Sequence, residues 1–146
     1  MKRFGVGVVS AILVAASLSL VAMSGPAYAA SSVTCKKVSG SISGTVTISL
    51  CSPVKAGYTS LSGLATKLVA GGPLTWSTSK KTTIIKTVAK QTGTGCKAPA
   101  MEYDVSGTVT GGTAAYTKVG DVVKGRACVN LLAKTVTLVP NTSITL

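Results

Sequence analysis

The 146-residue sequence predicts an all-β protein, a single-domain β-sandwich or small barrel of about seven to eight strands with two disulfides. Three observations lead to this prediction. Apolar and polar residues alternate with a period of two along several segments, as they do in strands that bury one face. Turn-forming residues separate these segments at near-regular intervals. The four cysteines are an even number and can therefore all pair.

The first 29 residues have the features of a secretory signal peptide. A basic start, Lys2-Arg3, precedes an uncharged apolar run that reaches Met23, and an A-x-A cleavage site ends at Ala29. A membrane-spanning helix is the alternative for an apolar run of this length, but the serines within it and the cleavage site favour a signal. We expect residues 30–146 to be one secreted β-rich domain, with no transmembrane span after signal removal.

The clearest alternation lies near the start of this domain. From Val38 to Leu50, every even position is apolar or glycine and every odd position is Ser or Thr. The pattern predicts extended chain over thirteen residues, with one buried and one solvated face. Similar alternation predicts strands over 101–110 and 123–129, and two short strands around a Pro140-Asn141 turn.

Three weaker strand-like segments lie between these: Tyr58–Val69, Leu74–Thr78 and Thr82–Ala89. In the first, the spacing of Leu61, Leu64 and Leu68 also suits a short helix. Gly63 and the density of Ser and Thr favour a strand instead.

Four glycines occur within the alternating segments, and they predict bulges or close backbone approaches. They are Gly40, Gly44, Gly107 and Gly125.

All four cysteines lie in the expected exported domain, where disulfides form readily. We prefer the sequential pairing, Cys35 with Cys51 and Cys96 with Cys128, because each pair encloses a hairpin-sized segment. Spacing alone leaves all three connectivities open. In the chain-entropy account, loops of 16 and 32 residues each contribute about 3 to 4 kcal/mol.

The composition removes several kinds of chemistry. The sequence has 15 Lys+Arg, three Asp+Glu and no histidine, so a Ser-His-Asp triad and a His-based zinc site lack their parts. Glu102 and Asp104, two positions apart on an expected strand, have a spacing that suits paired catalytic carboxylates, but a solvated patch is the commoner outcome. We expect no enzymatic activity, no catalytic residues, no metal and no cofactor.

The charge suggests a partner class. Removing residues 1–29 leaves 13 basic residues against three acids, a net charge of +10. Such a surplus favours salt-sensitive association with anionic cell-envelope polymers. Because the lysines are scattered and the domain has a single arginine and few aromatics, we expect no specific nucleic-acid binding. The partner is otherwise unknown.

Five short motifs are spread along the domain: Thr34 to Gly40 (TCKKVSG), Gly93 to Cys96 (GTGC), Glu102-Tyr103, Cys128-Val129 and Val139 to Thr142 (VPNT). Together they resemble a group of small exported actinobacterial proteins with no assigned activity. The resemblance implies a secreted protein and supplies no mechanism.

A second resemblance concerns Met101-Glu102-Tyr103-Asp104, which follows Cys96. Secreted subtilisin inhibitors of the same bacterial group are β-rich, carry two sequential disulfides and present a Met-x-Tyr-Asp stretch just after a cysteine. The resemblance implies an inhibitory loop around Met101 and Glu102, with Met101 entering the protease pocket. The sequence departs from that pattern, because four residues instead of one separate the cysteine from the methionine.

The alternative places Met101 and Tyr103 on the buried side of an alternating strand, and we favour it. The sequence thus suggests a non-enzymatic secreted protein of unknown function, a binding or cell-envelope-associated module, with a protease inhibitor as the alternative.

Overall fold

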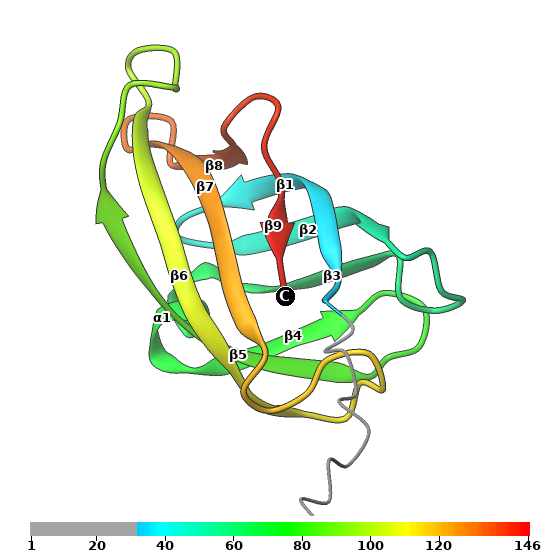
Figure 1. The fold of residues 1–146 in the computed structure, drawn as a ribbon. Coiled ribbons are helices and arrows are strands. Elements are labelled where there is room, and N and C mark those ends of the chain that lie inside the picture. Colours follow the sequence, from blue (N-terminus) through cyan, green and yellow to red (C-terminus); the bar gives the residue numbers. More distant parts are fainter. Residues whose placement is uncertain (1–31) are drawn as a thin grey trace, which may run out of the picture.

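The computed structural model describes residues 32–146, so the expected signal peptide lies outside the described residues. These residues form nine strands and one short helix (Figure 1). The elements are β1 Thr34–Ser41, β2 Thr45–Ser52, β3 Ser60–Leu64, α1 Ala65–Ala70, β4 Gly72–Trp76, β5 Thr82–Gln91, β6 Met101–Gly112, β7 Val122–Asn130, β8 Thr135–Leu138 and β9 Ile144–Thr145.

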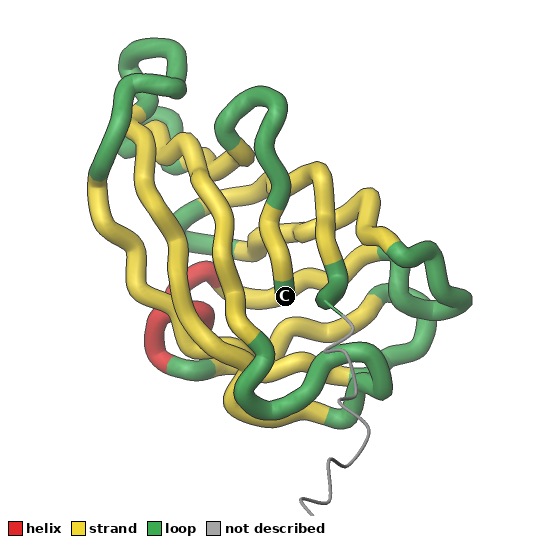
Figure 2. The backbone as a smooth tube through the Cα atoms, in the orientation of Figure 1, coloured by secondary structure: helices red, strands yellow, loops and turns green. Residues whose placement is uncertain are grey.

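Eight strands close an antiparallel barrel, which is visible as a curled wall of strands in Figure 2. Each of β1 to β7 pairs with the next strand, and β8 pairs back onto β1, with Ser39 opposite Thr137. The short β9 pairs with β1 and with β7, in the space between them that β8 leaves. The prediction of an all-β sandwich or small barrel is confirmed: the described chain forms a closed eight-stranded barrel with one extra strand.

The thirteen-residue alternation forms a hairpin of two strands. β1 and β2 are joined by a turn at residues 42–44, in which the Gly44 N–H donates to the Ser41 carbonyl at 3.2 Å. The pairing places Val38 opposite Ile48, so that residues of equal parity face each other. The alternation therefore continues through the turn without a break, and the pattern alone does not reveal where the chain reverses.

Both disulfides have the sequential pairing that we preferred. Cys35 and Cys51 are opposed residues of β1 and β2, and both are buried. Leu50, expected on the buried face, has a φ of 57° and is exposed, and Cys51 is buried next to it. The second disulfide, between Cys96 and Cys128, ties the loop of residues 92–100 to β7.

Residues 58–69 do not form one strand, so our expectation is wrong for the second half of this segment. β3 ends at Leu64, and α1 follows directly. The Ala65 N–H donates to the Gly44 carbonyl at 2.9 Å, which attaches the start of the helix to the β1–β2 turn. Gly71 ends the helix with a φ of 88°, the left-handed conformation that glycine adopts without a steric penalty.

Two of the strand glycines lie where neighbouring backbones come close, as predicted. A Cβ on Gly40 would collide with the Thr45 carbonyl oxygen, and one on Gly107 would collide with the Lys86 carbonyl oxygen. At Gly125 a Cβ would lie 3.0 Å from the Ile144 side chain. Gly44, by contrast, belongs to the β1–β2 turn.

Because successive strands of the barrel are antiparallel, their connections lie at alternate ends. The open end, on the left of Figure 1, carries four segments, namely the 42–44 turn, α1, the 92–100 loop and the tip of the β7–β8 hairpin at residues 131–134. The closed end carries residues 53–59, 77–81 and 113–121.

The interior is tightly packed near the closed end. Trp76, Leu74 and Leu146 are fully buried there. The Trp76 indole N–H donates to Thr83 Oγ1 at 2.9 Å, and that oxygen lies 2.7 Å from Thr117 Oγ1. The polar atoms of this buried cluster are therefore satisfied by one another, as buried polar groups must be.

Candidate functional site: an apolar cavity in the open end of the barrel

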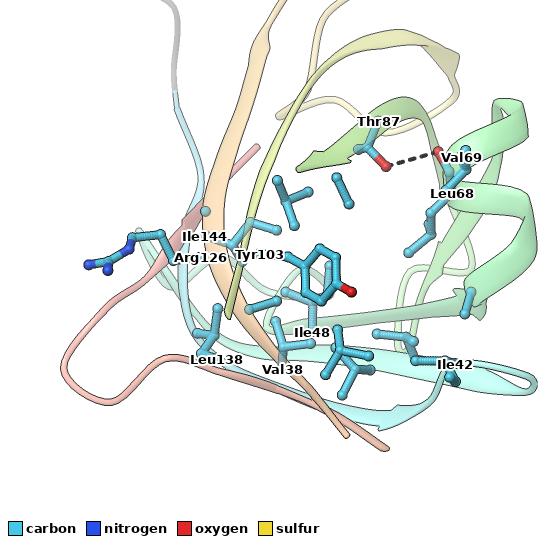
Figure 3. Close-up of a pocket in the computed structure, with 18 of the residues that line it drawn as sticks. Val38, Ile42, Ile48, Leu68, Val69, Thr87, Tyr103, Arg126, Leu138 and Ile144 are labelled. Atoms are coloured by element: carbon cyan, nitrogen blue, oxygen red, sulfur yellow. Dashed lines mark hydrogen bonds between the residues drawn. The ribbon is translucent and has the colours of Figure 1, made fainter. Parts of the chain in front are cut away.

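A cavity of about 150 Å³ lies inside the barrel, toward its open end (Figure 3). Apart from Thr87, Tyr103 and Arg126, every residue that lines it is apolar or glycine. Lining residues come from α1, from β1 and β2, from β5 to β9 and from the 42–44 turn, among them Ile42, Leu68, Val105, Val129, Val136 and Leu138.

The sequence leaves this space because its inward positions there are small. Ala65, Ala89, Gly125 and Ala127 line the cavity, and six of the other lining side chains are valines. The only phenylalanine of the chain is Phe4, so none occurs in the barrel, and the only tryptophan is buried near the closed end. An eight-stranded barrel is just wide enough for side chains to fill, so small inward residues leave a void.

The cavity communicates with the solvent. At inward positions nearer the closed end, Ile85, Val109 and Val123 are at most 1% exposed. At equivalent inward positions toward the open end, Tyr103 and Val136 are only half-buried. The exposure of inward side chains therefore rises toward the open end, where the cavity lies, and the cavity is not fully enclosed.

Tyr103 brings the cavity its one uncommitted polar group. Figure 3 shows the phenol ring among the lining side chains, with its hydroxyl directed into the cavity. Within residues 32–146 this hydroxyl makes no hydrogen bond. The Thr87 hydroxyl is already used, since it donates to the Leu68 carbonyl at 3.2 Å and so holds α1 against β5.

Helix α1 covers one side of the open end. Leu68 turns toward the cavity, whereas Val69 beside it is largely exposed. No residue of this six-residue helix is fully buried. The helix is held by the Ala65–Gly44 hydrogen bond, by the Thr87 hydrogen bond, and by Ala65 and Leu68, which are partly buried against the core.

Glu102, one of the sequence-predicted site residues, lies on the outer wall and is only 1% exposed. The Gly95 N–H donates to its Oε2 at 2.5 Å, and Arg126 Nε donates to its Oε1 at 2.7 Å. The Gly95 hydrogen bond lowers the pKa of this carboxyl, burial opposes that effect, and Arg126 lowers the pKa further. Our expectation of a solvated carboxylate is wrong here, because the 92–100 loop, fastened by the second disulfide, covers it.

Glu102 and Asp104 do not share a pocket. Asp104 is exposed, with Oδ1 3.8 Å from Arg126 Nε, and it lines a shallow surface depression with Lys124 and Ser143. The two carboxylates are therefore not assembled as a pair around a common space. In the described part of the chain, no three Cys, Asp or Glu side chains gather as a metal site would require.

Met101, the other residue assigned to an inhibitory loop, is the first residue of β6. It is half-buried and lies opposite Val129 of β7. Met101 and Glu102 thus occupy a paired strand, and the exposed segment at this end of the barrel is the 92–100 loop that precedes them. The inhibitory-loop hypothesis stays a prediction.

The basic residues all lie on the outside. Every lysine between residues 32 and 146 is exposed, and so is Arg126. Three of these lysines belong to the open end: Lys67, Lys97 and Lys134. Within the described residues, no helix has both the length and the apolar character needed to cross a bilayer.

The cavity was not predicted from the sequence. The sequence did contain an indication of unfilled space, since the small residues Gly125 and Ala127 share one face of a strand in a domain that has no phenylalanine. Comparison with known proteins found no matching family model, no matching curated protein and no matching solved structure.

Proposed function

We propose that this protein is a non-enzymatic binding protein that takes one small apolar ligand into the open end of its barrel. The observation that carries the proposal is the apolar lining of a solvent-connected cavity of about 150 Å³. An apolar cavity of this size can hold a molecule as large as benzene. A ligand that displaces weakly held water from this apolar lining gains the free energy of apolar burial.

The chemistry of the lining defines the ligand further. The guanidinium of Arg126 points away from the cavity in Figure 3 and is bound to Glu102, so no charged group faces the space. The Tyr103 hydroxyl supplies one hydrogen bond. The best ligand is therefore uncharged and mostly apolar, with a single polar group that meets Tyr103.

Export is part of the proposal. It is supported by the signal-like residues 1–29 and by two disulfides, which are typical of oxidising compartments. Membership of the small exported actinobacterial proteins is proposed on the motifs alone. Loose association with anionic envelope polymers is a second candidate function, favoured by the exposure of every lysine in the described chain.

Calorimetric titration with p-cresol and toluene tests ligand binding. We expect p-cresol and toluene to bind saturably with a Kd of about 1 mM or tighter, and we expect no binding of acetate. Val105→Phe fills the cavity and abolishes binding. Val88→Phe adds the same group to an exposed position of β5 and leaves binding unchanged.

Thermal unfolding of both variants confirms that they fold. Equal binding by folded Val105→Phe and Val88→Phe, or no binding by the parent protein, would contradict the proposal.

A further inference from the structure

We infer that the open end of the barrel docks on an anionic lipid bilayer, with Leu131 and Leu132 entering the headgroup region. The inference does not rest on ligand binding in the cavity. Vesicle binding is measured with no ligand present, so the two proposals fail separately.

The leucines are the first observation. Leu131 is 52% exposed and Leu132 is 85% exposed, at the tip of the β7–β8 hairpin. Residues of tight turns are usually Gly, Asn, Asp or Ser, which tolerate the backbone geometry and the solvent. Asn130 Oδ1 accepts a hydrogen bond from the Ala133 N–H at 2.9 Å and fixes the tip. Two adjacent large apolar side chains are thus held in water, and their transfer to an apolar environment is favourable.

The position of this tip is the second observation. The Ile42 N–H donates to the Lys134 carbonyl at 3.0 Å, which attaches the tip to the β1–β2 turn. The residues that flank it, Val129 and Val136, line the cavity. In Figure 1 the tip lies beside the 92–100 loop, at the same end of the barrel. A surface that binds the leucines therefore also faces the cavity opening.

Charge is the third observation. The segments of the open end carry Lys67, Lys97 and Lys134 and no acidic residue. Of the three acids, Glu102 is buried under the 92–100 loop and paired with Arg126, Asp104 is exposed on the barrel wall 3.8 Å from Arg126 Nε, and Asp121 lies at the closed end. An apolar anchor surrounded by lysines is the combination that binds anionic bilayer surfaces.

A bilayer fits this combination better than a wall polymer does. Teichoic acids and other soluble polyanions attract lysines but offer nothing apolar to Leu131 and Leu132. Binding to such polymers would depend on charge alone, and replacing the leucines would not change it. Leucine dependence therefore separates the two partners.

Vesicle sedimentation tests the inference. The protein without residues 1–29 is used, since the described fold lies within residues 32–146. We expect binding to vesicles of phosphatidylglycerol and phosphatidylcholine that weakens as salt rises. The double variant Leu131→Ser, Leu132→Ser lowers the partition coefficient about tenfold or more, from the lost apolar burial. Lys134→Gln lowers it about fivefold on these vesicles.

The matched control is Val54→Ser, Val119→Ser. These valines are 77% and 74% exposed in closed-end loops, so the control removes similar apolar groups from the opposite end. We expect it to bind vesicles as the parent does. Equal losses in both double variants, an unaffected leucine variant, or binding to soluble teichoic acid but not to vesicles would each overturn the inference.

Discussion

Arg126 lies directly opposite Asp104 in the β6–β7 register, yet its Nε is 2.7 Å from the Oε1 of Glu102 and 3.8 Å from Asp104. Glu102 is the buried carboxylate, and a buried charge without a partner is strongly destabilising. The exposed Asp104 is solvated and needs no such partner. The arginine therefore bonds diagonally across the wall to the carboxylate that needs a partner.

The first prediction concerns pH. Because the pKa of Glu102 is lowered from its ordinary value of 4.5, the folded state favours the ionised carboxylate. The resulting stabilisation is complete above the unfolded-state pKa and is lost as pH falls through the lower folded-state pKa. We expect the parent to lose stability below about pH 4.5 more steeply than Glu102→Gln does. Urea unfolding at several pH values measures this, and parallel pH profiles would contradict it.

The second prediction concerns the second disulfide. Cys96→Ser, Cys128→Ser should lower the free energy of unfolding by about 3 to 4 kcal/mol and free the loop that covers Glu102. The Gly95 amide, whose N–H is bound to Glu102, should then exchange its hydrogen faster. Cys35→Ser, Cys51→Ser should cost about 3 kcal/mol without this local effect. Slow exchange at Gly95 in the first variant would show that the disulfide does not hold the loop.

The third prediction concerns the buried cluster at the closed end. Thr83→Val leaves the Trp76 indole N–H without an acceptor and should cost about 1 to 3 kcal/mol. Thr75→Val, at an exposed position of β4, should change stability by less than about 0.5 kcal/mol. Fluorescence of the single tryptophan monitors unfolding in both variants. Equal stabilities would show that the hydrogen bond contributes little.

The fourth prediction separates the polar and apolar parts of ligand binding. Tyr103→Phe keeps the ring and removes the hydroxyl that faces the cavity. We expect it to weaken p-cresol binding about fivefold, the value of one hydrogen bond, and to leave toluene binding unchanged. Equal effects on the two ligands would place the bound polar group elsewhere.

The fold class was predictable because alternation reports directly which residues face inward. The hairpin at residues 42–44 was not, since β1 and β2 pair residues of equal parity and the pattern passes through the turn. Helix α1 was missed because Leu64 and Leu68 fit either conformation. The deciding residue is Gly71, whose left-handed conformation ends the helix.

The candidate site was less accessible to sequence reasoning. Inward positions were recognised from the alternation. Whether side chains fill the barrel depends on its width, which is set when β8 closes it by pairing with β1, a strand distant in sequence. The burial of Glu102 was not predictable either, because it also depends on contacts between residues distant in sequence. Alternation placed it correctly on the outer face, but a loop fastened through Cys96 lies over that face.

The most direct test of the account is an NMR measurement of contacts between bound p-cresol and the protein. We predict intermolecular nuclear Overhauser effects from p-cresol to the methyl groups of Val105 and Val136 and to the Tyr103 ring, all of which line the cavity. Effects confined to exposed methyl groups, such as those of Val88 or Val119, or no saturable effect at all, would show that the barrel does not hold a ligand.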